Sequence, residues 1–144
     1  MRLSVEQATD SQLEEIATWR YEPPYDFYDG DQDPALNPER FFTARDEDGE
    51  IVGFYYFDSR GDLLEYGLGL RPGLTGRGLG LDFVRVGLEF GRVRFRPGRV
   101  VLSVAAFNER ARIVYERAGF AVTGRHVRSF ARWGEIEFID MEEQ

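Results

Sequence analysis

The sequence predicts a mixed α/β (α+β) fold, in which a central sheet of about seven strands is flanked by helices. Apolar residues alternate or run continuously in seven short segments, as in strands, and recur at helical spacing in three others. The expected order is strand, helix, three strands, helix, strand, helix and two strands. No repeat, low-complexity tract or long linker interrupts this order, so we expect residues 1–144 to form a single domain.

The first half of the chain supplies one helix and four strands. Thr9 or Asp10 caps the helix, which has apolar residues at helical spacing. Turn residues at 46–49 and 58–62 separate strands that are rich in Phe and Tyr. The four strands are expected at residues 2–5, 41–45, 51–57 and 63–70.

The second half supplies two helices and three strands. One helix follows a glycine-rich segment and is expected to end at Gly91, and the next begins after its cap Asn108 and ends at Gly119. The strands are expected at residues 99–106, 120–128 and 133–141. The loop after the first of these helices is expected to present a solvated basic face made of Arg92, Arg94, Arg96 and Arg99.

Composition excludes several kinds of site. The 144 residues include no cysteine and no lysine, which excludes a disulfide scaffold, a thiolate zinc site, a cysteine nucleophile and a lysine Schiff base. The single histidine, His126, leaves little room for a histidine metal site, and we expect it on the surface. We therefore expect no metal.

Charge is distributed unevenly along the chain. Residues 1–50 carry 14 acids against 4 arginines, whereas residues 51–144 carry 12 acids against 14 arginines. The net charge of −8 disfavours a nucleic-acid partner, and the acidic first part suits a cationic partner. No apolar run is long enough to span a membrane, and the mixed N-terminus is unlike a signal peptide, so we expect a cytoplasmic protein with no membrane partner.

A glycine-rich segment links the strand that ends at Leu70 to the following helix. Gly76, Gly78 and Gly80 leave backbone N–H groups free at a helix N-terminus, an arrangement that binds phosphate or pyrophosphate. The P-loop pattern requires a lysine, and the dinucleotide fingerprint requires a different glycine spacing, so neither applies. A tight strand-to-helix turn without a ligand remains the alternative.

Two blocks of the sequence resemble motifs of the GNAT superfamily of acyl-CoA-dependent N-acetyltransferases. Thr75 stands where motif A usually has Arg or Gln, and the other positions of that motif match at Leu70, Pro72, Gly76, Gly78 and Gly80. Motif B matches at Asn108, Ala111, Tyr115, Gly119 and Phe120. The resemblance covers residues 51–141 and implies a GNAT-like, mostly antiparallel central sheet.

The resemblance implies that acetyl-CoA is the cofactor. The amides of Gly76 to Gly80 would hold its pyrophosphate, and the backbone of Leu68–Leu70 would pair with its pantetheine arm. Gly67 and Gly69 indicate either a bulge or a place where the strands part to admit the thioester. Residues 51–141 would bind acyl-CoA and residues 1–50 would face the acceptor. The cofactor-binding residues implied are Leu68, Gly69, Leu70, Thr75, Gly76, Arg77, Gly78, Leu79, Gly80, Asn108, Ala111 and Tyr115.

The resemblance also implies catalytic roles. Tyr115 would be the general acid that protonates the departing thiolate, with a packed aromatic as the alternative. Glu65, on the strand before the glycine segment, would take the amine proton, often through water, unless it faces the surface. Ribosomal-protein N-terminal acetyltransferases usually have a glutamate five residues before the motif B asparagine, where this chain has Ser103. This departure disfavours that subfamily and leaves Glu65, or a bound water, as the base.

The acceptor is expected to meet an aromatic and acidic segment that runs from Trp19 to Asp31. Aromatic faces and carboxylates together suit a protonated amine through charge and cation–π contact. A hydrophobic plug that closes the sheet, or a dimer contact, is the alternative reading of this segment. The substrate-contacting residues expected are Trp19, Tyr21, Tyr25, Asp26, Phe27 and Tyr28.

The resulting hypothesis is an N-acetyltransferase that transfers an acetyl group from acetyl-CoA directly to a primary amine on a small cationic molecule. Two alternatives remain open: an acetyltransferase that acts on a protein N-terminus or side chain, and a non-catalytic acyl-CoA-binding regulatory domain. Members of the superfamily often form homodimers, and this analogy extends to the present chain.

Overall fold

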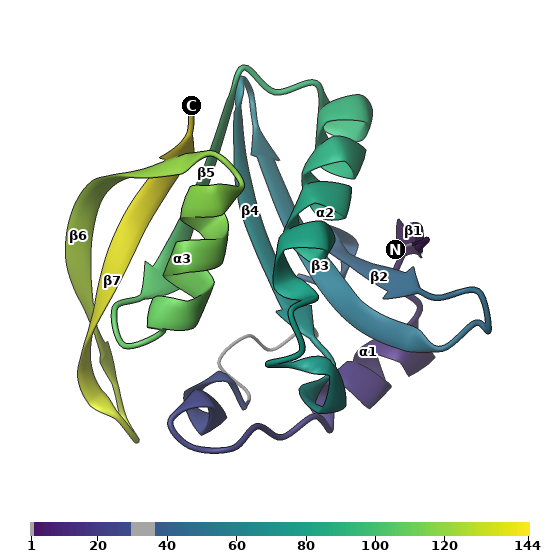
Figure 1. Cartoon of the computed structure of the whole chain (residues 1–144), viewed down its shortest axis with the longest axis horizontal. Coiled ribbons are helices and arrows are strands. Elements are labelled where there is room, and N and C mark those ends of the chain that lie inside the picture. The colour runs from purple at the N-terminus through teal and green to yellow at the C-terminus, as the bar shows by residue number, and fades with distance from the viewer. Residues whose placement is uncertain (1, 30–36) are drawn as a thin grey trace.

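The computed structural model describes residues 2–29 and 37–144, and its elements follow the expected order (Figure 1). Within these residues, seven strands form one sheet in the order β1-β2-β3-β4-β5-β7-β6. Only β4 and β5 pair in parallel, so the expected mixed, mostly antiparallel sheet is confirmed. The strands are β1 (Ser4–Gln7), β2 (Phe41–Arg45), β3 (Ile51–Arg60), β4 (Leu63–Leu70), β5 (Arg99–Ala105), β6 (Phe120–Phe130) and β7 (Gly134–Glu143).

The helices cover both faces of the sheet. α2 and α3 lie together on one face (Figure 1), and α1 lies on the other, where the Gln12 side chain accepts a hydrogen bond from Thr43 at 3.0 Å. In the described part of the chain, no helix is long and apolar enough to cross a membrane. The helices are α1 (Asp10–Ala17), η1 (Tyr25–Tyr28), η2 (Pro38–Arg40), η3 (Pro72–Leu74), α2 (Gly80–Phe95) and α3 (Glu109–Arg117).

Short local signals set the ends of two helices. The Thr9 hydroxyl accepts a hydrogen bond from the Gln12 N–H, and the Gln12 side chain accepts one from the Thr9 N–H, which together form a capping box. The Asn108 side chain caps α3 through the Ala111 N–H, and Gly119 follows this helix at φ 106°. Thr9 is therefore the first cap, and the expected caps of α3 are confirmed.

The main core lies between the sheet and the helix pair α2 and α3. The Tyr55 ring stacks on Phe83 of α2 with 4.5 Å between ring centroids. The Tyr55 hydroxyl donates to the Phe83 carbonyl at 2.6 Å, and the Tyr66 hydroxyl donates to the Val84 carbonyl at 2.9 Å. The aromatic strands are thus held to α2 by ring contacts and by hydroxyl groups with partners.

α2 approaches the sheet closely because two of its glycines face aromatic side chains. A Cβ atom on Gly87 would lie 2.2 Å from the Tyr66 hydroxyl oxygen, and one on Gly91 would lie 2.8 Å from Phe57 Cε1. Gly91 is therefore a packing residue, and the expectation that it ends the helix is wrong. α2 continues to Phe95.

The longer α2 changes the position of the arginine run. Arg92 and Arg94 lie in the last turn of this helix and not in the following loop. Arg92 forms an ion pair with Glu143, and Arg99 binds Glu142 at 2.7 Å. The run lies at the end of α2 that is remote from the glycine segment, and two of its members bind carboxylates of β7.

Gly67 and Gly69 do not mark a bulge. The β3–β4 ladder runs from Gly53–Leu70 to Arg60–Leu63 without a shift in register. A Cβ atom on Gly69 would lie 2.5 Å from Phe54 Cε1, so this position has to be glycine for the Phe54 ring to cover it.

We predict that Gly87→Ala lowers the free energy of unfolding by about 1–3 kcal/mol, because the new methyl group has no room beside the two tyrosine rings. Urea unfolding followed by circular dichroism measures the change. Gly73→Ala is the matched control, since a Cβ atom there meets nothing within 4 Å. The control should change the unfolding free energy by less than about 0.5 kcal/mol. Equal midpoints for Gly87→Ala and the wild type would contradict this packing.

Candidate active site

The sheet opens between its two central strands. β4 and β5 pair from Leu63–Arg99 to Glu65–Val101. Beyond Glu65, the described strands pair only with their outer neighbours: β4 with β3, and β5 with β7 as far as Ala105. β4 and β5 therefore part toward their C-terminal ends. We call the space between β4 residues 66–70 and β5 residues 102–105 the strand gap.

Backbone groups of β4 face the strand gap. The Arg71 N–H donates to the Val52 carbonyl of β3 at 2.9 Å. In an antiparallel ladder, alternate residues direct both backbone groups to the partner strand. Leu68 and Leu70 therefore direct their N–H and C=O groups away from β3 and into the strand gap. An extended arm in the gap would pair with these groups as an added strand.

The glycine segment leads from the open end of the strand gap to α2. Gly76 and Gly78 have φ angles of 72° and 76°, in the region that favours glycine. A Cβ atom on Gly78 would meet nothing within 4 Å, so its backbone faces open space. Gly80 has a different role, because its Cβ position lies 3.5 Å from Val114 Cγ2 and marks the contact of α2 with α3.

The N-terminus of α2 has no side-chain cap. Leu79 is its N-cap residue and makes no capping hydrogen bond, which leaves the first-turn amides and the positive end of the helix dipole for an anion. Arg77 is exposed in the segment itself. Arg110 of α3 places Nη1 3.3 Å from the Cβ position of Gly76. The segment therefore fits a pyrophosphate group, and Arg110 is a cation that the sequence motifs did not identify.

Asn108 connects α3 to the segment expected to meet the acceptor. Its Oδ1 accepts a hydrogen bond from the Ala111 N–H at 3.1 Å, and its Nδ2 donates to the Tyr28 hydroxyl at 3.0 Å. Both polar atoms of the side chain thus have protein partners. The cofactor contact that the resemblance implies for Asn108 stays a prediction.

Tyr115 is half-buried on α3. Its ring packs at the edge of the main core, 6.1 Å from the Phe120 ring. Burial, followed by the nearby Tyr28 phenol, raises the pKa of Tyr115. The phenol is therefore protonated at neutral pH, which is the state that a general acid requires.

Glu65 lies at the closed end of the strand gap, on the opposite face of the sheet from α2. Its neighbours Leu64 and Tyr66 are buried in the main core, so strand alternation places Glu65 on the other face. Arg60 donates to Glu65 at 2.9 Å and also pairs with the buried Asp58 at 2.8 Å. The carboxylate expected to act as the base is thus already bound to an arginine.

Residues 19–29, which we call the acceptor segment, span the strand gap. The Tyr21 hydroxyl donates to the Leu70 carbonyl at the end of β4 at 2.7 Å. The Tyr28 hydroxyl accepts from Asn108, which follows β5. These two bonds lie on opposite sides of the gap. The Tyr21 N–H donates to Asp29 at 2.9 Å and closes the segment into a loop.

Phe27 anchors the acceptor segment and is the one residue expected to contact substrate that the structure buries, at 3% exposure. It packs in a second core cluster with Ala105 and Phe138. The hydrophobic-plug reading therefore applies to Phe27, which offers no surface to a ligand. Its ring contacts are with Tyr28, Phe107, Phe130, Trp133 and Phe138.

The other expected acceptor residues keep part of their surface. Trp19 packs 6.2 Å from Phe54, and Tyr25 lies under the Arg110 guanidinium at 4.5 Å. Asp26 is half-buried. Two further residues expected in this segment lie outside the described part of the chain: Gly30 and Asp31.

A polar cluster beside the strand gap was not anticipated from the sequence. Ser103 Oγ donates to Asp140 at 2.8 Å, and His126 Nδ1 lies 3.1 Å from the other oxygen of Asp140. His126 stacks on Phe138 and keeps 35% of its side chain exposed, so it lies at the surface as expected, but with defined partners. The only local signal was an aspartate between two buried residues of β7, since its contact with Ser103 depends on sheet register.

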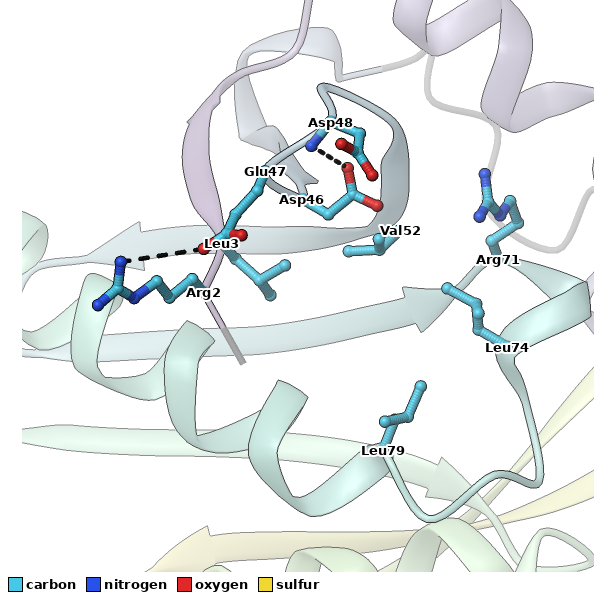
Figure 2. Close-up of a pocket in the computed structure, with 9 residues that line it drawn as sticks. All are labelled: Arg2, Leu3, Asp46, Glu47, Asp48, Val52, Arg71, Leu74 and Leu79. Carbon is cyan, nitrogen blue, oxygen red and sulfur yellow. Dashed lines mark hydrogen bonds and ion pairs between the residues drawn. The ribbon is translucent and has the colours of Figure 1, made fainter.

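A surface hollow of about 590 Å³ lies between the β2–β3 turn and the start of α2 (Figure 2). Asp46 uses one of its oxygens to accept the N–H groups of Asp48 and Glu50, and Glu47 pairs with Arg2 at 3.9 Å. None of its lining residues belongs to β5 or α3. We therefore place the candidate site at the strand gap. The hollow is lined by Arg2, Leu3, Asp46, Glu47, Asp48, Val52, Arg71, Leu74 and Leu79.

Residues 8–120 match the family model described as the acetyltransferase (GNAT) family. The mycothiol acetyltransferase of Streptomyces avermitilis is 38% identical over 101 residues, which cover 67% of this chain and 32% of the relative. That of Corynebacterium efficiens is 41% identical over 80 residues, which cover 54% and 27%. The chain thus spans about a third of the length of these curated relatives.

Solved structures share the fold. A chimera based on the spermidine N-acetyltransferase from Vibrio cholerae has a TM-score of 0.80 at 18% identity, covering 99% of this chain and 95% of that chain. The spermidine N-acetyltransferase from Vibrio cholerae in complex with CoA and spermine has a TM-score of 0.75 at 18% identity, covering 97% and 94%.

We predict that Tyr21→Phe lowers the free energy of unfolding by about 1 kcal/mol, because the Leu70 carbonyl loses its hydrogen bond. The same variant should accelerate proteolysis within residues 19–29. Tyr25→Phe is the matched control, because the Tyr25 contact described above uses the ring face. Equal stability and cleavage rates for the Tyr21 and Tyr25 variants would contradict a role of this bond in holding the acceptor segment.

Proposed function

Because the chain belongs to the acetyltransferase (GNAT) family, we propose that it transfers an acetyl group from acetyl-CoA directly to a primary amine. The observation that carries the proposal is the strand gap, whose open end leads to the uncapped N-terminus of α2. The gap offers backbone groups to an extended arm, and α2 offers amides to an anion. Acetyl-CoA combines a pantetheine arm with a pyrophosphate.

The residues around the strand gap have separate roles in binding acetyl-CoA and in proton transfer. When bound, acetyl-CoA supplies an activated acetyl thioester. The amides of Gly76–Gly80 hold its pyrophosphate, and Arg77 and Arg110 add positive charge. The backbone of Leu68–Leu70 fixes the arm. Tyr115 holds the proton that the departing sulfur requires.

We propose a small cationic amine as the acceptor. Trp19 supplies a ring face, and Asp26 and Asp29 supply carboxylates, on the segment that spans the gap. Aromatic faces combined with negative charge favour an ammonium group. The structural neighbours named for spermidine act on cations of this class, which supports the same choice here.

We also propose separate roles for the two parts of the chain. Residues 51–141 bind acyl-CoA and residues 1–50 face the acceptor, within one domain that comprises residues 1–144. That the chain forms a homodimer stays a prediction, which rests on the analogy with other members of the superfamily.

Release of free thiol from acetyl-CoA tests the function directly. The purified protein is incubated with acetyl-CoA and a panel that contains spermidine, spermine, an amino sugar and a short peptide with a free N-terminus. We expect thiol release with a cationic small amine. Preference for the peptide would support the protein-acetylating alternative. Thermal stabilisation by acetyl-CoA without turnover of any amine would support the non-catalytic alternative and contradict the proposal.

We predict that Gly78→Ala weakens acetyl-CoA binding about tenfold, because a Cβ atom would occupy the space that the anion needs and the φ angle of 76° disfavours alanine. Isothermal titration with acetyl-CoA measures the loss. Gly61→Ala is the matched control: it has a φ of 60° and open space, in the remote β3–β4 turn. Both variants should lose similar stability, and only Gly78→Ala should lose affinity. Equal affinities would rule out the glycine segment as the pyrophosphate site.

We predict that Tyr115→Phe lowers kcat about 100-fold and leaves acetyl-CoA binding unchanged, because the phenol acts only on the departing sulfur. The raised pKa of Tyr115 keeps the phenol protonated as pH rises, so wild-type kcat should not fall through about pH 10, where an ordinary tyrosine ionises. Steady-state kinetics between pH 6 and pH 10.5 measure both effects. A kcat that is equal in the variant, or that declines near pH 9, would exclude this role.

A further inference from the structure

A hydrogen-bonded cluster adjoins the strand gap on the face of the sheet away from α2 and α3. Leu102 and Val104 of β5 are buried in the main core, so Ser103 between them faces the other way. Ser103 follows Val101, the last residue of β5 that pairs with β4, by two residues or about 7 Å along the strand. Asp140 of β7 is the register partner of Ser103.

The hydrogen bonds of the cluster define the protonation state of its histidine. Arg128 Nε donates to His126 Nε2 at 3.1 Å, and a guanidinium can only donate, so Nε2 accepts. His126 Nδ1 then carries the proton that it shares with Asp140 at 3.1 Å. His126 is therefore neutral in this arrangement. Its ring lies on Phe138 with 5.4 Å between centroids and 11° between planes.

Asp140 differs from the other carboxylates of this face. Arg60 binds both Asp58 and Glu65. Glu142 binds Arg99. Among the described residues, no arginine forms an ion pair with Asp140, whose side-chain partners are Ser103 and His126. A carboxylate has about four sites that accept hydrogen bonds, so Asp140 retains capacity for an ammonium group.

The electrostatics keep Asp140 ionised. Partial burial acts to raise the pKa of this carboxyl group, but the hydrogen bonds from Ser103 and His126, with the charge of Arg128, lower it overall. The groups that face the pair are Ser103 from β5 and Arg128 from β6. A carboxylate with a lowered pKa attracts a cation but is a weak base, whereas the unprotonated nitrogen of a neutral imidazole can accept a proton.

We propose that Asp140 and His126 form the acceptor-side proton site, an inference that rests on the acetyl transfer proposed above. Asp140 attracts the ammonium form of the acceptor to the strand gap. Because Nε2 lies on the ring edge opposite Asp140, one ammonium proton reaches it through solvent, in place of the hydrogen bond from Arg128, which leaves a neutral amine and an imidazolium beside Asp140. His126 thus takes the role expected of Glu65. Both groups have an arginine partner, but His126 adjoins Asp140, which attracts the amine.

The remaining bonds and protons balance. The amine lone pair forms the C–N bond with the thioester carbonyl, and the C–S bond breaks with protonation of the sulfur by Tyr115. The second proton that the nitrogen loses returns to Tyr115 through solvent. The imidazolium, on a side chain that is 35% exposed, releases its proton to water. Each turnover thus yields one amide, one thiol and one proton.

Kinetics of three variants with the amine identified in the panel test this pair. Asp140→Asn should raise KM for the amine about tenfold, because the ammonium loses its counter-charge. His126→Gln should lower kcat/KM about 100-fold near pH 7. This loss should be smaller at higher pH, where a larger fraction of the amine is already deprotonated.

Glu142→Gln is the matched control. It removes the same charge from the same strand and face, but from a carboxylate bound to Arg99, and it should leave kcat/KM within about twofold of the wild type. Acetyl-CoA should stabilise all variants equally against heat. Wild-type kinetics and pH profiles in the Asp140 and His126 variants, or equal losses in Asp140→Asn and Glu142→Gln, would overturn the inference while acetyl transfer stands. A wild type that binds acetyl-CoA but acetylates no amine would overturn both.

Discussion

The parting of β4 and β5 is the constraint on which the rest of the structure depends. Each strand keeps a long antiparallel partner, β4 with β3 and β5 with β7, so the sheet stays continuous although the parallel ladder ends at Glu65–Val101. Backbone groups that leave a ladder need another partner. Leu70 has one in the Tyr21 hydroxyl, and the groups of Leu68 face the gap for water or a ligand to satisfy.

The two faces of the sheet give the strand gap two chemically different sides. On the core side lie the glycine segment, with its amides and arginines, and the protonated Tyr115. On the other side lie the acceptor segment and the carboxylates of Glu65 and Asp140. An anionic ligand and a cationic ligand would therefore approach one another from opposite faces. Of the groups on the second side, only the acceptor segment belongs to the acidic first part of the sequence.

Local patterns predict much of the fold because their causes are local. The hairpin of residues 41–57 and the caps at Thr9 and Asn108 depend on turn chemistry and on side chains within four residues of one another. The sequence does not reveal the role of Gly91, because a glycine that ends a helix and a glycine that packs against an aromatic ring look alike in sequence. Only the position of Phe57 on a neighbouring strand distinguishes these roles.

The candidate site was predictable only in part, for the same reason. The spacing of Gly76 and Gly78 predicts an anion site because successive amides of one loop form it. The pairing of Ser103 with Asp140 joins residues 37 positions apart and depends on strand register. Phe27 shows a further limit, because the sequence of an aromatic loop does not reveal which ring turns inward and which lines a surface.

Hydrogen exchange of backbone amides with and without acetyl-CoA tests the central claim that the strand gap and the glycine segment form the cofactor site. Slower exchange is predicted at Leu68 and Leu70, where the N–H groups face the gap, and at Gly76–Gly80. The amides of Leu63 and Glu65, already within a ladder on the closed side, should change little. Protection confined to the hollow around Asp46–Asp48, or no protection at Gly76–Gly80, would contradict the account.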